Sequence, residues 1–172
     1  QLNEDIRTKA NNYLKPETPY AGETKVLHYL EVLRDEIGWD KVKAAVTHPL
    51  TGKKIGAYYG CMLLRPSREM QFDDPENPQI LEDFIRAIGA EPVVYAQRNE
   101  CCGGYMTVEN KSYAAKQAQK IADDAAAQGA ELLITACPLC MYNLTQNTEK
   151  KLPVVYFTEL LAQALGCGEE DA

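Results

Sequence analysis

Five of the six cysteines stand in three groups, and each group closely follows a short apolar run that predicts a β-strand. The runs and the cysteines that follow them are 55–59 with Cys61, 92–96 with Cys101 and Cys102, and 132–136 with Cys137 and Cys140. In a parallel sheet the carboxyl ends of neighbouring strands meet at one edge, so thiols far apart in sequence are expected to converge there. Convergent thiols indicate a metal or redox centre.

From Lys54 onward, predicted strands alternate with predicted helices, which indicates an α/β fold. The predicted strands cover 55–59, 92–96, 132–136 and 154–157, and the predicted helices cover 78–88, 108–128, 138–147 and 158–165. Continuous apolar strands such as Leu132-Leu133-Ile134 are typical of a parallel sheet that is buried on both faces. Right-handed crossovers then favour an open, flavodoxin-like or Rossmann-like sheet of four strands in the order 2-1-3-4, with helices on both faces.

The segment before residue 50 is predicted to be helical, with a break at 16–22. Its main helix is expected to begin at Thr24 as the N-cap and to end at Gly38, and a short second helix follows. In the α/β part, Asn77 is the expected N-cap of the first helix. We therefore divide the chain into a helical lead-in, 1–50, and a cysteine-rich α/β domain, 51–172.

Composition excludes several classes of function. A net charge of -7 argues against nucleic-acid binding, because phosphate neutralisation needs clustered Lys and Arg. No apolar run reaches the roughly 18 to 20 residues that cross a bilayer, and 1–5 lack the features of a signal peptide, so we expect a cytoplasmic protein without a membrane span. The first residue is Gln1 rather than Met, which favours a fragment or a processed product. In a reducing compartment, grouped thiols indicate metal ligation or catalysis rather than structural disulfides.

The local context of the thiols favours bound anionic sulfur. Cys137 is the expected N-cap of a helix that carries Cys140 in its first turn, where the helix dipole favours thiolates. The glycines that follow the adjacent cysteine pair, Gly103 and Gly104, let backbone N–H groups approach sulfur closely. The side chains of adjacent cysteines diverge, so such a pair suits two iron atoms better than one. Five thiols exceed what a tetrahedral zinc or an ordinary 4Fe-4S cube requires, which favours a larger iron-sulfur assembly.

Simpler interpretations stay open at this point. They are a zinc module that uses four of the thiols, a metal-independent dithiol oxidoreductase that uses Cys137 and Cys140, and a vicinal disulfide between Cys101 and Cys102. Cys167, in the polar tail, is expected to be an exposed thiol outside the site. His28 and His48 are expected to be structural.

On these residues the chain resembles the cysteine-rich CCG-domain family, and specifically the C-terminal half of the B subunit of heterodisulfide reductase or of a bacterial homologue. The motifs that carry the resemblance are Tyr58-Tyr59-Gly60-Cys61, Arg65-Pro66, Phe72-Asp73-Asp74-Pro75, Cys101-Cys102-Gly103-Gly104 and Cys137-Pro138-Leu139-Cys140. The lead-in, with its segment 28–33, also resembles the inter-domain segment of that family.

The resemblance implies a noncubane 4Fe-4S cluster with five ligands, which are Cys61, Cys101, Cys102, Cys137 and Cys140. It implies an oxidoreductase that splits a small disulfide by one-electron steps or relays electrons, together with iron-sulfur and flavin subunits of a reductase complex. The family's full subunit has a second cysteine-rich domain upstream, so this chain alone need not turn over. Met62 stands where the resemblance predicts His, which removes a candidate proton donor and disfavours the methanogen coenzyme disulfide as substrate.

Overall fold

Four parallel strands form one sheet in the order β2-β1-β3-β4, which confirms the predicted fold class and strand order. The strands are β1 (Lys54–Tyr58), β2 (Glu91–Val93), β3 (Leu132–Thr135) and β4 (Val154–Tyr156). The structure is a computed structural model and describes residues 3–149 and 152–167. Strand β2 is shorter than predicted, because the chain soon turns into the 3-10 helix η2 (Ala96–Asn99).

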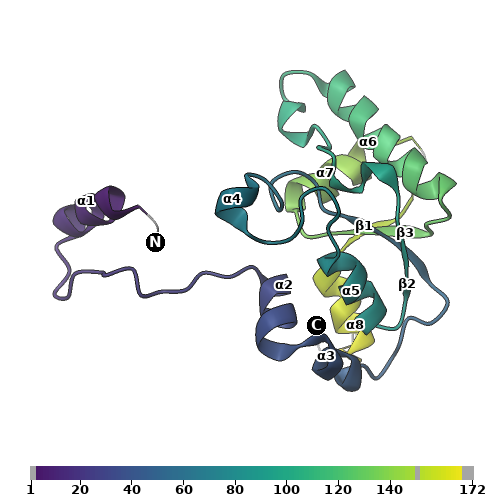
Figure 1. Ribbon diagram of the computed structural model, residues 1–172. Helices are drawn as coiled ribbons and strands as arrows, with labels where there is room; N and C mark the ends of the chain where they lie inside the picture. Colours follow the sequence, from purple (N-terminus) through teal and green to yellow (C-terminus); the bar gives the residue numbers. More distant parts are fainter. Residues whose placement is uncertain (1–2, 150–151, 168–172) are drawn as a thin grey trace.

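Helices cover both faces of the sheet (Figure 1). On one face lie α5 (Ile80–Ala87) and α8 (Phe157–Ala164), and on the other lie α6 (Lys111–Ala127) and α7 (Pro138–Gln146). Successive strand residues point to opposite faces, so β1 contributes to both cores. Ile55 and Ala57 belong to the core beneath α5 and α8, and Tyr58 belongs to the core beneath α6 and α7.

The lead-in divides into a projecting part and a packed part. Helix α1 (Glu4–Leu14) buries no residue and lies away from the body at the end of an extended segment (Figure 1). The helices that follow are α2 (Tyr29–Glu31), the π-helix η1 (Val32–Ile37) and α3 (Trp39–Ala45). They carry Leu30, Leu33 and Val42 into the same core as Ile55. The sheet domain and the packed part of the lead-in therefore share one core.

Three predicted helix starts are wrong. Helix α6 begins at Lys111, after its N-cap Asn110, rather than at 108, because the Asn110 side chain accepts a hydrogen bond from the Tyr113 N–H. The main lead-in helix begins at His28 rather than at Thr24, because the His28 ring accepts a hydrogen bond from the Leu30 N–H while Glu31 accepts one from the His28 N–H. Helix α5 begins after Gln79 rather than after Asn77, because the Asp73 carboxylate accepts hydrogen bonds from the N–H groups of Gln79 and Ile80.

The remaining short elements lie in the loops beyond the carboxyl ends of β1 and β2. They are α4 (Ser67–Met70) and the 3-10 turn η3 (Gly104–Met106). Across 3–149 and 152–167, no helix has both the length and the apolarity to cross a membrane. The first residue, on which the expectation of a fragment rests, and most of the predicted polar tail, 168–172, lie outside the described residues.

Candidate metal centre

The three cysteine groups lie beyond the carboxyl ends of the three strands that sequence analysis placed before them. Cys61 lies in the turn after β1, and Cys101 and Cys102 follow η2. Cys137 occupies the N-cap position of α7, and Cys140 lies in the first turn of that helix. Because the strands are parallel, these segments meet at one edge of the sheet.

The sulfur atoms of the three groups are in contact. The Sγ atoms of Cys61 and Cys101 are 3.6 Å apart, and those of Cys102 and Cys140 are 3.7 Å apart. Cys137 interacts with Cys140 from the start of the same helix. The five predicted ligands are free thiols in two contacting sets, which are joined through the adjacent residues Cys101 and Cys102. Cys167 is exposed and takes part in neither contact.

The spacing within each pair fits thiolates that share one metal. With metal–sulfur bonds of about 2.3 Å, two sulfurs on one tetrahedral metal lie about 3.8 Å apart. The observed pairs place Cys101 with Cys61 and Cys102 with Cys140, so the adjacent cysteines belong to different pairs. In the part of the chain that the structure describes, no three His, Cys, Asp or Glu side chains are arranged around one metal position. The two pairs and Cys137 are a set of thiol donors of the kind that binds soft metals.

Two glycines allow the sulfurs to approach the backbone. Gly60 has a φ of +67°, and a Cβ at this position would lie 2.9 Å from the Sγ of Cys140. A Cβ on Gly104 would lie 3.2 Å from the Sγ of Cys102. The absence of these side chains lets the turn after β1 and the loop after η2 close on α7.

Backbone N–H groups point at the sulfurs of the adjacent pair. Gly103 donates to the Sγ of Cys101, and Gly104 donates to the Sγ of Cys102, each at 3.3 Å. Such donors stabilise negative charge on sulfur, which is the role that sequence analysis expected for these glycines.

Their surroundings make two of the thiols acidic. The neighbouring Cys140 thiol lowers the pKa of Cys137 to about 6, and the N–H groups of Cys140 and Leu139 at the helix start add to this effect. Cys140 likewise lowers the pKa of Cys102 to about 6, with further hydrogen bonds from the Gly104 N–H and the Asn143 side chain. Near neutral pH both thiols are therefore mainly in the thiolate form, which is the form that binds metal.

The partners of these thiolates keep their protons. Interaction with the sulfurs of Cys102 and Cys137, together with burial, raises the pKa of Cys140. Burial is the largest cause that raises the pKa of Cys61 to about 11, and its hydrogen bond to Cys101 is the next. Metal binding at these two positions would release protons.

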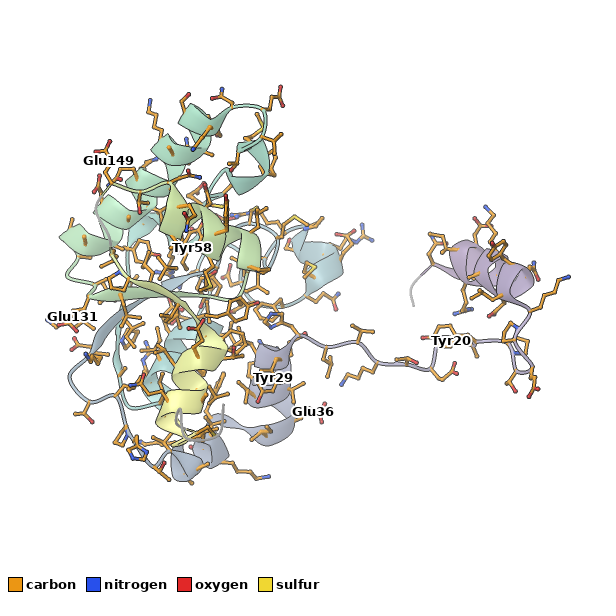
Figure 2. All side chains as sticks on the ribbon, turned by 180° about the vertical axis from the view of Figure 1, so that it is seen from behind. Tyr20, Tyr29, Glu36, Tyr58, Glu131 and Glu149 are labelled. Atoms are coloured by element: carbon orange, nitrogen blue, oxygen red, sulfur yellow. The ribbon has the colours of Figure 1, made fainter. Side chains whose placement is uncertain are left out.

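Three buried polar groups support the cysteine loops, and sequence analysis did not identify their roles. The Tyr58 hydroxyl donates to the carbonyl oxygen of Glu100 at 2.7 Å, and Figure 2 shows Tyr58 inside the body, far from Tyr20 on the projecting segment. Asn143 donates from Nδ2 to the carbonyl oxygen of Cys102 at 2.7 Å. Asn is unfavourable inside a helix, and this helix begins with two site cysteines, which is a signal that could have identified Asn143.

The third group is a buried ion pair beside the loop that leads to Cys101. Arg98 Nε lies 3.3 Å from Glu82 Oε1, and both side chains are buried. Tyr59 donates to the other oxygen of Glu82, and burial raises the pKa of this carboxyl. The backbone N–H of Tyr59 also donates to the carbonyl oxygen of Arg98 at 2.8 Å. The end of β1, α5 and η2 are thus joined directly before two of the cysteine groups.

Met62, His28 and His48 are the other residues for which sequence analysis gave an expectation. Met62 is 71% exposed next to Cys61, so this position offers an apolar side chain to the surroundings of the site. His28 caps α2, and its ring contacts Phe72 and Phe157. His48 contacts the hydroxyl of Thr47 at 3.0 Å. His28 therefore has a structural role, as expected, whereas the structural role of the exposed His48 stays a prediction.

Comparison with known proteins agrees with this geometry. The sequence model of the cysteine-rich domain named CCG matches residues 55–145, which include all five site cysteines. The chain belongs to the cysteine-rich CCG-domain family. The resemblance drawn from the sequence motifs is therefore confirmed.

Several curated proteins are similar to the chain along most of its length. The 8-methylmenaquinol:fumarate reductase membrane anchor subunit of Wolinella succinogenes is 30% identical over 96% of this chain and 61% of its own length. The B subunit of the Ferredoxin/F(420)H(2)-dependent CoB-CoM heterodisulfide reductase of Methanosarcina acetivorans is 30% identical over 88% of the chain and 54% of its own length. A protein of Archaeoglobus profundus, named as similar to the B subunit of heterodisulfide reductase, is 28% identical over 98% of this chain and 61% of its own length. The chain thus spans between 54% and 61% of these three relatives, all of which are named as reductase subunits or as similar to one.

Proposed function

We propose that this chain is the iron-sulfur domain of a heterodisulfide-reductase-like oxidoreductase. In this proposal Cys61, Cys101, Cys102, Cys137 and Cys140 hold a noncubane 4Fe-4S cluster, and the domain reduces a small disulfide or relays electrons. The partners are iron-sulfur and flavin subunits of a cytoplasmic reductase complex, and full turnover requires more of the protein than this chain. The proposal also keeps the division into a lead-in, 1–50, and a cysteine-rich domain, 51–172.

The pairing of the thiols is the observation that carries the proposal. The adjacent cysteines contact different partners, at 3.6 Å and 3.7 Å, and Cys137 adds a fifth sulfur beside Cys140. Two pairs at metal-sharing distance and one further thiolate match a group of several irons better than one zinc. The curated relatives are named as reductase subunits, which supports the same class of chemistry.

When bound, such a cluster supplies electrons one at a time. The residues of this chain hold it and balance its negative charge: Gly103 and Gly104 donate N–H groups to two of the sulfurs. Tyr58 holds the loop that carries these glycines through its bond to Glu100. Met62 has no proton to donate, so a thiolate released from a disulfide at this site would take its proton from another group or from water.

Anaerobic reconstitution tests the proposal. The reduced protein is incubated with iron and sulfide, and iron, sulfide and zinc are then measured together with the paramagnetic resonance spectrum. We expect about four irons per chain and a matching amount of sulfide. Replacement of each of the five site cysteines by Ser should lower the iron content or change the spectrum, whereas the control Cys167→Ser should leave both unchanged. One tightly bound zinc without sulfide would replace the proposal by a zinc module.

Electron relay without disulfide chemistry is the second candidate, and Met62 favours it because this position lacks a proton donor. The two candidates differ in one product. With the complete reductase complex, stepwise reduction of the site in the presence of a small disulfide releases two thiols per disulfide if the site reduces disulfides. Reduction and reoxidation without thiol release would assign the domain to electron relay.

A further inference from the structure

Asn143 is a fully buried polar side chain at the centre of the contacts between the cysteine segments. It lies on α7 after Cys140, and 0% of its surface is exposed. A buried amide is costly unless its donor and acceptor atoms find partners, and Asn also lowers helix propensity. A specific set of contacts must therefore offset these costs.

Both ends of the Asn143 amide have partners. Nδ2 lies 2.7 Å from the carbonyl oxygen of Cys102, to which it donates, and 3.5 Å from that of Ala114. Oδ1 accepts a hydrogen bond from Nδ2 of Asn147 at 2.6 Å. One side chain thus links α7, the loop of the adjacent cysteines and the first turns of α6.

The hydrogen bond from Asn143 to Cys102 lies beside the contact between the sulfurs of Cys102 and Cys140. Cys102 and Cys140 are each almost fully buried, and their Sγ atoms are 3.7 Å apart. Cys140 is fixed by the helix that carries it, but Cys102 belongs to a loop without regular structure. The bond from Asn143 to the Cys102 carbonyl oxygen joins the backbone of this loop to the helix. The Gly104 N–H that donates to the Cys102 sulfur depends on the same loop conformation.

We propose that Asn143 is a positioning residue of the metal centre: its side-chain amide holds the backbone of Cys102 against α7 and so sets the geometry of the Cys102–Cys140 pair. Asn suits this position because it offers a donor to the carbonyl oxygen and an acceptor to Asn147 at once. A carboxylate would have no donor for the carbonyl oxygen and would add negative charge beside the thiolates. An apolar side chain of similar size would leave the Cys102 carbonyl oxygen without this partner.

Hydrogen exchange in the metal-free, reduced protein is the first test, and it does not depend on the bound group. In Asn143→Leu the amide of Gly104 should exchange about five to ten times faster than in the wild type, the ratio that corresponds to loss of one hydrogen bond. The matched control is Leu144→Ala, which removes the neighbouring buried side chain of α7 and destabilises the helix but keeps the Asn143 amide that bonds the Cys102 carbonyl oxygen. Equal exchange at Gly104 in the two variants would overturn the proposal.

The second test rests on the proposed function, because it uses the reconstituted iron-sulfur protein. Asn143→Asp should give a more negative midpoint potential than the wild type, since added negative charge disfavours reduction, and Asn143→Leu should change the paramagnetic resonance spectrum without the added charge. Leu144→Ala should keep the wild-type spectrum. Identical potentials and spectra in all variants would overturn the role of Asn143. If the wild type itself binds no iron-sulfur group, the proposed function fails while the exchange experiment still decides the positioning role.

Discussion

At the scale of single residues, the site combines chemically identical thiols with different proton affinities. The neighbours of each thiol cause the difference: Cys137 receives hydrogen bonds from Cys140 and from the start of α7, whereas Cys61 is partly buried and donates to Cys101. The thiolate is the form that binds metal and attacks electrophiles. In the metal-free protein, thiol labelling can therefore report the electrostatics of the site.

We predict that iodoacetamide labels Cys137 roughly thirty to a hundred times faster than Cys61 at pH 7. With pKa values of about 6 and about 11, the thiolate fractions differ by roughly four orders of magnitude, and the lower nucleophilicity of the more acidic thiol offsets about two of them. The rate at Cys137 should rise through about pH 6 and then level off. Peptide mass spectrometry of the reduced protein measures both rates, and equal rates at the two sites would contradict the prediction.

At the scale of elements, the buried ion pair of Arg98 and Glu82 holds η2 against α5 close to the cysteine loops. The Arg98 Nε and Glu82 Oε1 atoms have no hydrogen bond of good geometry, although they lie 3.3 Å apart, so the pair acts mainly through charge. Arg98 also reaches the Asn77 side chain at 2.6 Å, which fixes the loop before α5. Removal of the arginine would leave a carboxylate in a dry environment.

Arg98→Met should lower the free energy of unfolding by about 3 to 5 kcal/mol at pH 7, as is typical for the loss of one partner of a buried pair. Arg86→Met is the control, because Arg86 pairs with Asp83 on the same helix α5 but both side chains are substantially exposed. This control should cost no more than about 1 kcal/mol. Chemical denaturation of the reduced, metal-free proteins measures both values.

The loss of unfolding free energy caused by Arg98→Met should also depend on pH, and it should grow as the pH rises. Burial already raises the pKa of Glu82 in the folded protein, so the folded state binds its proton more tightly than the unfolded state. The contribution of Glu82 to the free energy of unfolding is thus highest below the ordinary pKa of a glutamate. It is lost as the pH rises towards the pKa of Glu82 in the folded protein. Without Arg98 the ionised Glu82 lacks its charged partner, so this loss of stability is larger. The difference in unfolding free energy between Arg98→Met and the wild type should therefore shrink as the pH falls towards about 4 and widen at higher pH. A difference that is constant with pH would mean that Arg98 acts by packing alone.

At the scale of the whole molecule, the packed part of the lead-in and the sheet domain share a core, while α1 projects from it. Leu30, Leu33 and Val42 are buried in the cluster that also contains Ile55 and Phe84. Helix α1 buries no residue, and Figures 1 and 2 both show it apart from the body. Different parts of the first 50 residues should therefore contribute very differently to stability.

A chain that starts at Thr24 should unfold with the same free energy as the full chain to within about 0.5 kcal/mol, because the described part of the deleted segment, 3–23, adds no side chain to either core cluster. A chain that starts at Thr51 should fail to fold or lose more than about 5 kcal/mol, since three buried aliphatic side chains are removed together. Denaturation curves of the two truncated proteins measure this. A stable chain from Thr51 would show that the cysteine-rich domain needs no lead-in.

The pattern of strands, helices and cysteines was enough to predict the sheet order and the edge at which the thiols meet. Each cysteine group stands directly after an apolar run, and parallel strand topology alone brings such positions together. The bond geometry of adjacent residues likewise predicted that the side chains of Cys101 and Cys102 diverge, and their separate contacts with Cys61 and Cys140 agree with this. These features depend on local sequence and on chain direction, which a single sequence contains.

The polar groups that support the site and the exact starts of several helices depend on contacts that form only when the chain folds. Asn143 meets Cys102 across 41 positions of sequence, and Tyr59 meets Glu82 across 23, so no local pattern indicates either contact. Thr24 and Asn77 are good caps by residue type, yet His28 and Asp73 bind the helix N–H groups because the folded chain places them there. The fold and the convergence of the cysteines can be predicted from one chain of residues, because both follow from periodicity and strand direction. The hydrogen bonds and proton affinities of the site come from side chains that meet only after folding.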